Sequence, residues 1–324
     1  MSKRQATFCF IFFVVHSAMS AQTPFKKIAN QPLVAINSID SDDFADLKFL
    51  DTLVQNKRVV FLGESSHYVA DFNILKFRLI RYLHQQHGFE VVVFESGIDD
   101  CGWSNIMKDS LTDIEMLAGS VKGIWRTREN LPLMNYIRLN HMELAGMDAV
   151  GGGYFIIYQN KLIKTLPDPS LFVKLFKIDS VYGREYIRPV MRNARPDSRL
   201  DSMAAILGNE YRHLNAEIVK KPKDQQNLLL RRTVDTRLLS MTSPDNWNYT
   251  KITGGEFREQ QMADNLRFLL DTLYPGKKVI VWAHNGHISK IAQGPNKAES
   301  IPSHLPERIM LQSYVLGLCA FDGE

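Results

Sequence analysis

Five acidic and imidazole side chains in this 324-residue sequence have the chemistry of a hydrolytic site. They lie in three separate segments and are Glu64, His67, Glu95, His284 and His287. A nearby carboxylate orients an imidazole and makes it more basic, so such a histidine can take a proton from water. A second pair of histidines can donate to a developing oxyanion or protonate a leaving alcohol. Together these residues predict attack of activated water on an ester, without a covalent intermediate.

Short apolar runs precede each of these segments and are typical of buried parallel strands. The runs cover residues 58–63, 90–94 and 278–283, and a weaker run at 143–147 ends at Asp148. Amphipathic patterns alternate with them, which predicts an α/β fold with a central, mostly parallel sheet flanked by helices. Because the carboxyl ends of parallel strands open on one edge, we expect the polar side chains to converge there. Exposed loops also carry polar residues, which is the alternative explanation. Exposure could explain the polar residues after one or two of the four apolar runs, but it explains their presence after all four runs less well.

A helix is predicted from Asp71 to His87, with Gly88 as its C-terminal cap. Lys76 falls near the centre of the apolar stripe of this helix. Burial of an unpaired ammonium is costly, so we expect Lys76 to reach a carboxylate or a polar pocket near His67. The alternative is a lysine that extends along the helix to water.

Residues 155–250 contain few β-branched runs and are patterned mainly as helices. This segment predicts a helical insertion or cap on the sheet, within one domain that spans residues 22–324.

The composition excludes several classes of protein. The sequence has 39 basic and 35 acidic residues, and the formal charge of +4 is too small to indicate a nucleic-acid partner. With 45% hydrophobic residues the chain can bury a large core, so it is not intrinsically disordered. Its 3 cysteines cannot form a disulfide scaffold.

The first 21 residues have the pattern of a secretory signal peptide. Lys3 and Arg4 precede an apolar run over residues 8–15, and small residues follow up to Ala21. The run is too short to span a membrane, so we expect an exported protein, periplasmic or secreted, without a stable membrane span. An N-terminal strand or a buried helix is the alternative.

Two other mechanisms use the same part of the sequence. Ser65, Ser66 or Ser96 could act as a nucleophile, but the chain has no Gly-x-Ser-x-Gly elbow. The five acidic and imidazole side chains are also suitable ligands for zinc or manganese. However, Glu64 with His67 and His284 with His287 lie on predicted turns and not on a helix, where i, i+3 spacing aligns ligands, so each pair alone is a weak metal motif. We expect no metal and no cofactor, and the metal alternative stays open.

Two motifs resemble the signatures of the erythromycin esterase family. Residues 63–67 and the strand that ends in Glu95 resemble its N-terminal signature. Residues 258–265, followed by 282–287, resemble a second signature, and the similarity covers residues 45–320. The resemblance implies a hydrolase that opens the lactone of a macrolide antibiotic without a metal, an activity associated with antibiotic resistance.

The same resemblance implies roles for individual residues. It implies that His67 is the general base, that Glu64 and Glu95 support it, and that His284 and His287 assist the carbonyl or the leaving group. Contacts with a small-molecule ester are expected from Lys76, Tyr68, Asp71, Asp148 and Arg258.

Two departures from the family pattern concern the substrate. Tyr68 replaces a glycine that usually follows the histidine, and Lys76 replaces an arginine, which keeps the charge but loses the planar fork. The pocket can therefore fit a different ester. Two alternatives stay open: a metal-dependent hydrolase, and a non-catalytic binding protein linked to cell-surface polysaccharide.

Overall fold

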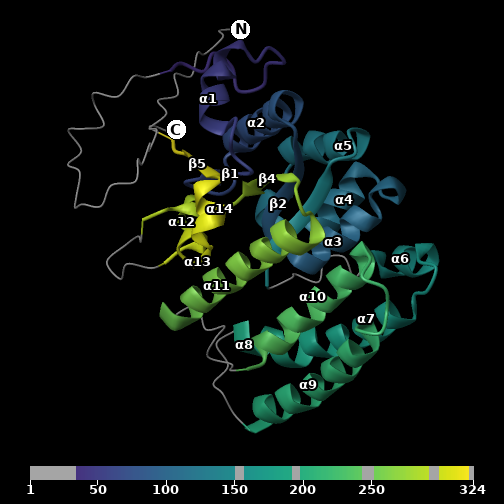
Figure 1. Cartoon of the computed structure of the whole chain (residues 1–324). Helices are drawn as coiled ribbons and strands as arrows, with labels where there is room; N and C mark the ends of the chain where they lie inside the picture. Colours follow the sequence, from purple (N-terminus) through teal and green to yellow (C-terminus); the bar gives the residue numbers. More distant parts are fainter. Residues whose placement is uncertain (1–33, 150–156, 192–197, 243–251, 292–298, 321–324) are drawn as a thin grey trace.

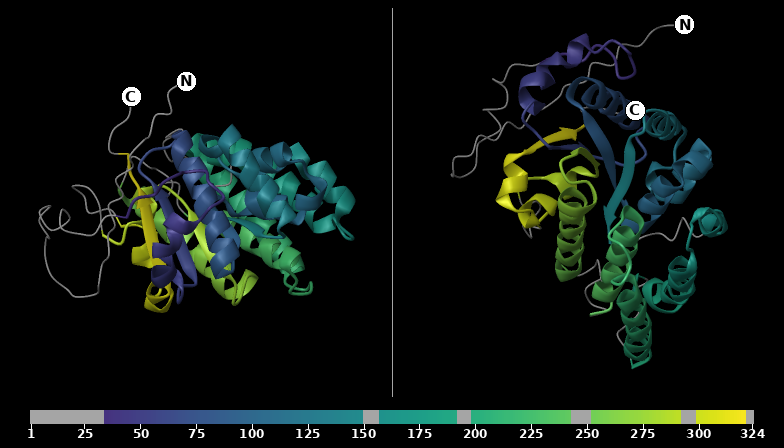
Figure 2. Two further views of the ribbon diagram at one scale, coloured as in Figure 1. Left: turned by 90° about the horizontal axis from the view of Figure 1, so that it is seen from above. Right: turned by 45° about the vertical axis from the view of Figure 1, so that its right-hand side comes forward.

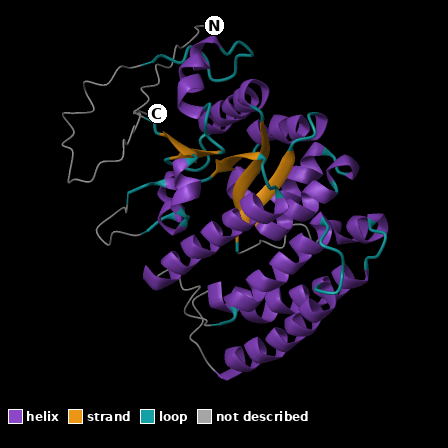
Figure 3. Cartoon of the chain, viewed as in Figure 1, coloured by secondary structure: helices purple, strands orange, loops and turns teal. Residues whose placement is uncertain are grey.

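A five-stranded parallel sheet forms the centre of the protein in a computed structural model that describes residues 34–149, 157–191, 198–242, 252–291 and 299–320. The strand order is β3-β2-β4-β1-β5, and every pair of neighbouring strands is parallel. The strands are β1 (Val59–Glu64), β2 (Phe89–Gly97), β3 (Glu143–Asp148), β4 (Lys278–Trp282) and β5 (Ser313–Leu318). Figure 3 shows the sheet at the centre with helices around it. The predicted α/β fold is therefore confirmed.

The three central strands are apolar because both faces of the sheet are covered. All six residues of β1 are buried, and β2 and β4 each have only one residue outside the buried class. Such continuous burial explains why these strands read as unbroken apolar runs and not as alternating patterns.

The strand order places helices on both faces of the sheet. The chain moves from β1 over β4 to β2 and on to β3, and then returns to β4 and over β1 to β5. Because parallel crossovers are right-handed, the outward connections cover one face and the returning ones cover the other. Figure 1 shows α2 and α5 on one side of the sheet and α11 on the other. The helices of these connections and of the N-terminal segment are α1 (Asp51–Val54), α2 (Ala70–His87), α3 (Ile98–Ile106), α4 (Asp113–Ser120), α5 (Leu131–Leu139), α11 (Ile252–Phe268), α12 (Asn285–Ile288), α13 (Ile301–His304) and α14 (Glu307–Leu311).

Helix α2 confirms the predicted helix after the first strand. It ends at Gly88, whose φ of 67° lies in the left-handed region that favours glycine. The Gly88 amide donates to the carbonyl oxygens of Leu83 and His84 and so caps the helix. Lys76 is fully buried, at 0% exposure, as its position in the apolar stripe predicts.

The carboxyl ends of two strands extend further than the sequence pattern indicates. Glu64 is the last residue of β1 and pairs with Leu318, and Glu95 lies inside β2 and not after it. β2 continues to Gly97, which pairs with Asp148 after a change of register. The carboxylates therefore project from the rigid ends of strands and not from loops.

A helical bundle follows β3, in the segment predicted as helical. Its helices are α6 (Gln159–Thr165), α7 (Ser170–Val181), α8 (Arg188–Met191), α9 (Ser198–Ile218) and α10 (Gln225–Ser240). α10 packs against α9 and also against α3, which itself contacts β3. Figure 2 shows α9 (green) and the α1 segment (purple) at opposite ends of the molecule. The bundle is thus joined to the sheet through α3, on the β3 side.

A buried cluster of charges connects the bundle to α3. The Arg237 guanidinium of α10 donates to Asp99 of α3, and its Nε lies 3.4 Å from Asp179 of α7. Tyr211 of α9 donates to the same Asp179 at 2.5 Å, and the Arg237 side chain is only 6% exposed. One buried cation thus holds acidic groups from two parts of the fold.

Three features of the sequence concern export, disulfides and membrane spans. The predicted signal peptide over residues 1–21 lies outside the described residues. Of the described cysteines, Cys101 is buried, Cys319 is exposed and neither forms a disulfide. Within the described part of the chain, none of the helices is both long and apolar enough to cross a membrane.

Removal of the Arg237 charge should destabilise the protein strongly. We expect Arg237→Met to lower the free energy of unfolding by about 3–5 kcal/mol, because two buried carboxylates lose their cation. Lys174→Met is the matched control, since Lys174 pairs with Glu217 on the surface and the loss there should stay below about 1 kcal/mol. Urea denaturation measures the free energy of unfolding of both variants. Similar decreases in Arg237→Met and Lys174→Met would contradict the anchoring role of Arg237.

Candidate active site

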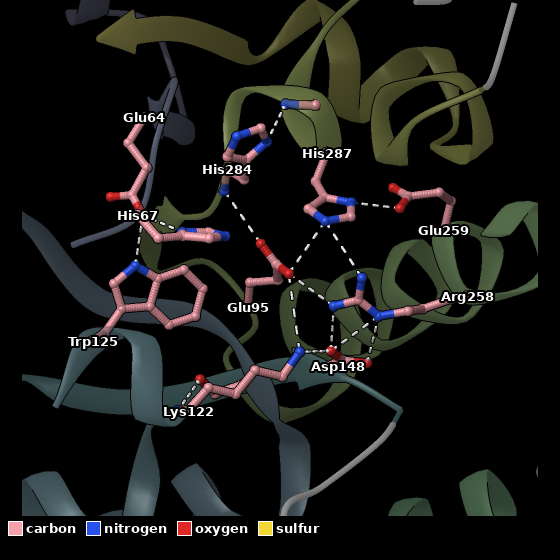
Figure 4. A network of polar contacts seen from close by, with 12 residues as sticks. Glu64, His67, Glu95, Lys122, Trp125, Asp148, Arg258, Glu259, His284 and His287 are labelled. Carbon is pink, nitrogen blue, oxygen red and sulfur yellow. Dashed lines mark hydrogen bonds and ion pairs between the residues drawn. The ribbon is translucent and has the colours of Figure 1, made fainter. Parts of the chain in front are cut away.

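The polar side chains at the carboxyl ends of the strands converge in one network of contacts (Figure 4). Glu64 comes from β1, Glu95 from β2 and Asp148 from β3, while His284 and His287 follow β4. β2, β4 and β1 are direct neighbours in the sheet, so their ends are only about 5 Å apart. The predicted convergence is therefore present in the structure.

His67 and Glu64 form a pair suited to general base catalysis. Nδ1 of His67 lies 2.8 Å from Oε1 of Glu64. A carboxylate only accepts, so Nδ1 carries the hydrogen and Nε2 of the neutral ring keeps its lone pair. The His67 side chain is 31% exposed, whereas the Glu64 side chain is only 2% exposed. Nε2 is therefore a proton acceptor at a solvent-accessible ring that is held by a buried acid.

Two further donors hold the Glu64 carboxylate. Nζ of Lys76 donates to Oε2 at 2.8 Å, and Nε1 of Trp125 donates to Oε1 at 2.7 Å. The Lys76 ammonium also lies 4.6 Å from the centre of the Trp282 ring. Burial lowers the pKa of Lys76 to about 8, although the negative charge of Glu64 opposes the change. The expectation that Lys76 reaches a carboxylate is confirmed.

Glu95 lies between two positively charged side chains. Its Oε1 accepts from Nη2 of Arg258 at 2.7 Å and lies 3.2 Å from Nε2 of His287. Its Oε2 accepts from the backbone amide of His284 at 3.2 Å. Burial alone would raise the pKa of Glu95, but the charges of His287 and Arg258 hold it well below its usual value. Glu95 is therefore ionised.

Asp148 extends this cluster toward β3. It is fully buried and accepts from Nη2 of Arg258 at 2.5 Å and from the ammonium of Lys122. Burial opposes ionisation, yet the positive charges of Arg258 and Lys122 lower the pKa of Asp148. Arg258 thus bridges Asp148 and Glu95.

His287 is held between two carboxylates. Nδ1 faces Glu259 and Nε2 faces Glu95, both of which only accept, and Nη1 of Arg258 also lies 3.3 Å from Nε2. Burial and the nearby Arg258 disfavour a charged ring, but the carboxylates outweigh them and raise the pKa of His287 to about 9. His287 is thus an imidazolium at neutral pH.

His284 is fixed by the backbone around it. Its Nδ1 accepts from the amide of Gly286 at 3.0 Å, at the N-terminus of α12. Its Nε2 lies 3.2 Å from the carbonyl oxygen of Ser65, so Nε2 carries the hydrogen. The ring packs 5.1 Å from the His67 ring, measured between centroids. His284 therefore connects the β1 and β4 ends and lies beside His67.

The remaining predicted residues differ in their accessibility. Tyr68 is 72% exposed directly after His67, and Asp71 lies half-buried in the first turn of α2. Ser65 and Ser66 are exposed, whereas Ser96 is fully buried and accepts from the Lys122 amide. Lys76 and Asp148 are 0% exposed, and their contact with the substrate stays a prediction. Both act on the site through the groups that they hold.

Three residues of the network are missed by the sequence reasoning. Lys122 and Trp125 belong to the loop between α4 and α5, where residues Gly123–Trp125 form a 3₁₀ turn. Glu259 follows Arg258 on α11. No strand end precedes any of them, so the rule that locates the other residues does not apply. The available signal for Trp125 is that a buried indole usually needs an acceptor for its N–H.

The described residues contain no group of three or more His, Cys, Asp or Glu side chains that could hold a metal ion. Instead, the buried carboxylates face the cations Lys76, Lys122, Arg258 and His287.

Comparisons with known proteins show that the chain is similar to several hydrolases. Residues 182–324 match the model of a family described as erythromycin esterase. A putative hydrolase of Bacillus subtilis, YbfO, is 28% identical over 90% of this chain and 70% of its own length. Erythromycin esterase type I of Escherichia coli is 25% identical over 82% of this chain and 71% of its own length. A solved structure of a succinoglycan biosynthesis protein has the same fold, with a TM-score of 0.66 and 20% identity over 87% of this chain and 71% of that chain. The resemblance found in the two motifs is confirmed.

The charge on His287 predicts a pH-dependent contribution to stability. The pKa of His287 rises from 6.5 to about 9 on folding, so its stabilisation is complete below pH 6.5 and is lost as the pH rises through 9. We expect His287→Gln to lower the free energy of unfolding by a few kcal/mol more at about pH 6 than at about pH 10. Urea denaturation at both pH values measures this difference, with the exposed His213→Gln as control. A loss that does not depend on pH would contradict the imidazolium assignment.

Proposed function

Because the chain is related to the erythromycin esterase family, we propose that it is a hydrolase that cleaves a carboxylic ester, most specifically the lactone of a macrolide antibiotic. The observation that carries this proposal is the contrast between two histidines in one site. His67 has one carboxylate partner and an open Nε2, whereas His287 is protonated between Glu95 and Glu259. Because their surroundings differ, we assign His67 as the base and His287 as a cationic group.

In the proposed reaction, Nε2 of His67 takes a proton from water as the water oxygen attacks the ester carbonyl carbon. Glu64 keeps the Nδ1–H tautomer and stabilises the imidazolium that forms. The ester C–O bond then breaks, and the leaving alkoxide receives the proton held by His67. The products are an acid and an alcohol, with one water consumed.

The cations beyond the base serve the developing oxyanion. His287, Arg258 and Lys122 surround Glu95 and Asp148, so their positions are fixed before the substrate binds. Groups fixed in advance stabilise new negative charge without reorganisation. Glu95 keeps His287 charged and also holds the His284 amide, which keeps the turn after β4 in place.

Substrate recognition is proposed for the exposed residues next to His67. Tyr68 and Asp71 lie on the loop and first helical turn that follow the base, and they can contact the body of the ester. We further propose that residues 1–21 are removed on export and that residues 22–324 form one domain; N-terminal sequencing of the exported chain tests this.

Mass spectrometry of the purified protein incubated with a panel of macrolides and generic esters tests the reaction. The expected result is a product heavier than its substrate by one water. Turnover that is insensitive to a chelator distinguishes this mechanism from a metal-dependent hydrolase. Absence of turnover on every ester would favour a non-catalytic binding protein.

Two substitutions test the roles of the base and of its acidic neighbour. We expect His67→Ala and Glu95→Gln each to lower kcat by at least about 10²–10⁴-fold, the range for loss of acid–base catalysis, while the folded state is retained. His213→Ala, on the exposed face of α9, is the control and should keep wild-type kinetics. Wild-type rates in both active-site variants would reject the mechanism.

Tyr68 offers a test that separates binding from stability. Its φ of 64° lies in the left-handed region, which costs a non-glycine residue about 1–2 kcal/mol. Tyr68→Ala removes the ring and keeps this strain, whereas Tyr68→Gly removes both. We expect KM to rise similarly in the two variants, and Tyr68→Gly to be more stable than Tyr68→Ala by about 1 kcal/mol. Unchanged KM in both variants would show that Tyr68 does not contact the substrate.

A further inference from the structure

Trp125 is the one large aromatic side chain, among the described residues, whose polar atom contacts Glu64. It is 0% exposed and lies at the end of the 3₁₀ turn Gly123–Trp125. The fully buried Asn130 donates from Nδ2 to the Trp125 carbonyl oxygen at 2.8 Å, which fixes the backbone of the turn. The indole is therefore held in place independently of the site that it contacts.

The indole contacts both members of the base pair. Its N–H donates to Oε1 of Glu64 at 2.7 Å, and Nδ1 of His67 donates to the same oxygen at 2.8 Å. Its ring also packs edge-on against the His67 ring, with 5.6 Å between centroids and an interplanar angle of 88°. On its other side it lies 6.0 Å from the Phe94 ring of β2. Trp125 thus fills the space between the sheet and the imidazole.

The sharing of one oxygen has an electrostatic consequence. A carboxylate oxygen that accepts two hydrogen bonds divides its negative charge between two donors. Lys76 holds the second oxygen, so the carboxylate cannot rotate without losing a buried hydrogen bond. The strength and direction of the Glu64–His67 hydrogen bond therefore depend on the indole N–H.

We propose that Trp125 is a positioning residue for the base, which fixes the Glu64 carboxylate and moderates its pull on the His67 proton. This inference rests on the proposed function for its kinetic part only. The packing of the ring against His67 sets the direction of Nε2, and the N–H sets how strongly Glu64 favours the protonated imidazole.

The same short segment also contacts the cationic half of the site. Lys122, immediately before the turn, donates to Asp148 and lies 3.9 Å from Oε1 of Glu95. One loop between α4 and α5 thus touches the base pair through Trp125 and the acidic cluster through Lys122. The position of this loop therefore affects both the Glu64–His67 pair and the cluster of Glu95 and Asp148.

Kinetics of Trp125→Phe test the proposal. The variant keeps an aromatic ring but has no N–H, so more negative charge faces His67 and the protonated ring is favoured. We expect kcat to fall by about tenfold or more through misplacement of the base, KM to change little, and the acid limb of the kcat/KM profile to move to higher pH. Trp103→Phe is the matched control, because Trp103 is buried on α3 against Phe172 and away from the network.

A measurement without substrate tests the role of Trp125 independently of the proposed ester hydrolysis. Nitrogen-15 chemical shifts of His67, assigned with His67→Gln, report which ring nitrogen carries the hydrogen. The wild-type protein should show the Nδ1–H tautomer, and Trp125→Phe should keep this tautomer but protonate Nε2 at higher pH, because Oε1 has lost one donor. If the wild-type protein hydrolyses no ester, the proposed function fails and this readout still decides the role of Trp125.

A second variant tests the proposal if Trp125→Phe does not fold. Benzothienylalanine at position 125, introduced by nonsense suppression, replaces the N–H by sulfur and keeps the shape of the indole. The proposal predicts that His67 of this variant also protonates at higher pH and that the acid limb moves in the same direction. Wild-type behaviour would overturn it, and so would a lower kcat with an unchanged protonation of His67 and an unchanged acid limb, since that result indicates packing alone.

Discussion

Neutralisation of buried carboxylates is the constraint on which the rest of the site depends. Glu64, Glu95, Asp148 and Glu259 are each at most 7% exposed. A buried carboxylate without a cation destabilises a fold by several kcal/mol, so each of these groups requires a positively charged neighbour. Lys76, Lys122, Arg258 and protonated His287 provide four positive charges. The strand ends that carry the acids therefore determine where the helices and loops that carry the cations must lie.

The same balance explains why the two catalytic candidates differ although both are histidines beside glutamates. Glu64 has Lys76 as its cation, and His67 contacts Glu64 through Nδ1, which leaves Nε2 available. In the second cluster, Glu95 and Asp148 lie beside Lys122 and Arg258, and His287 adds a positive charge between Glu95 and Glu259. The charge of His287 thus follows from the carboxylates that surround it.

The parts of the site that could be predicted from the sequence are those set by local patterns. Apolar runs identify β1, β2 and β4, and the parallel arrangement brings the residues at their ends together. Lys76 is conspicuous because a charge in an apolar stripe must find a partner. Trp125 and Lys122 have no such pattern, since a 3₁₀ turn between helices takes its position from tertiary packing. The contact of the His284 ring with Ser65 has no such pattern either, because it depends on how the turn after β4 meets the end of β1.

Burial separates the residues that can change with the substrate from those that cannot. Glu64, Lys76 and Trp125 are enclosed, and a change in any one of them leaves a buried polar group without its partner. Tyr68 is exposed, so its replacement leaves no buried polar group without a partner, although its left-handed backbone is strained. Strain of this kind persists only where the surrounding structure enforces it. The loop after β1 can therefore acquire a new side chain, while the buried acids keep His67 and the cations in place. Under the proposed function, such a change alters the ester that is recognised.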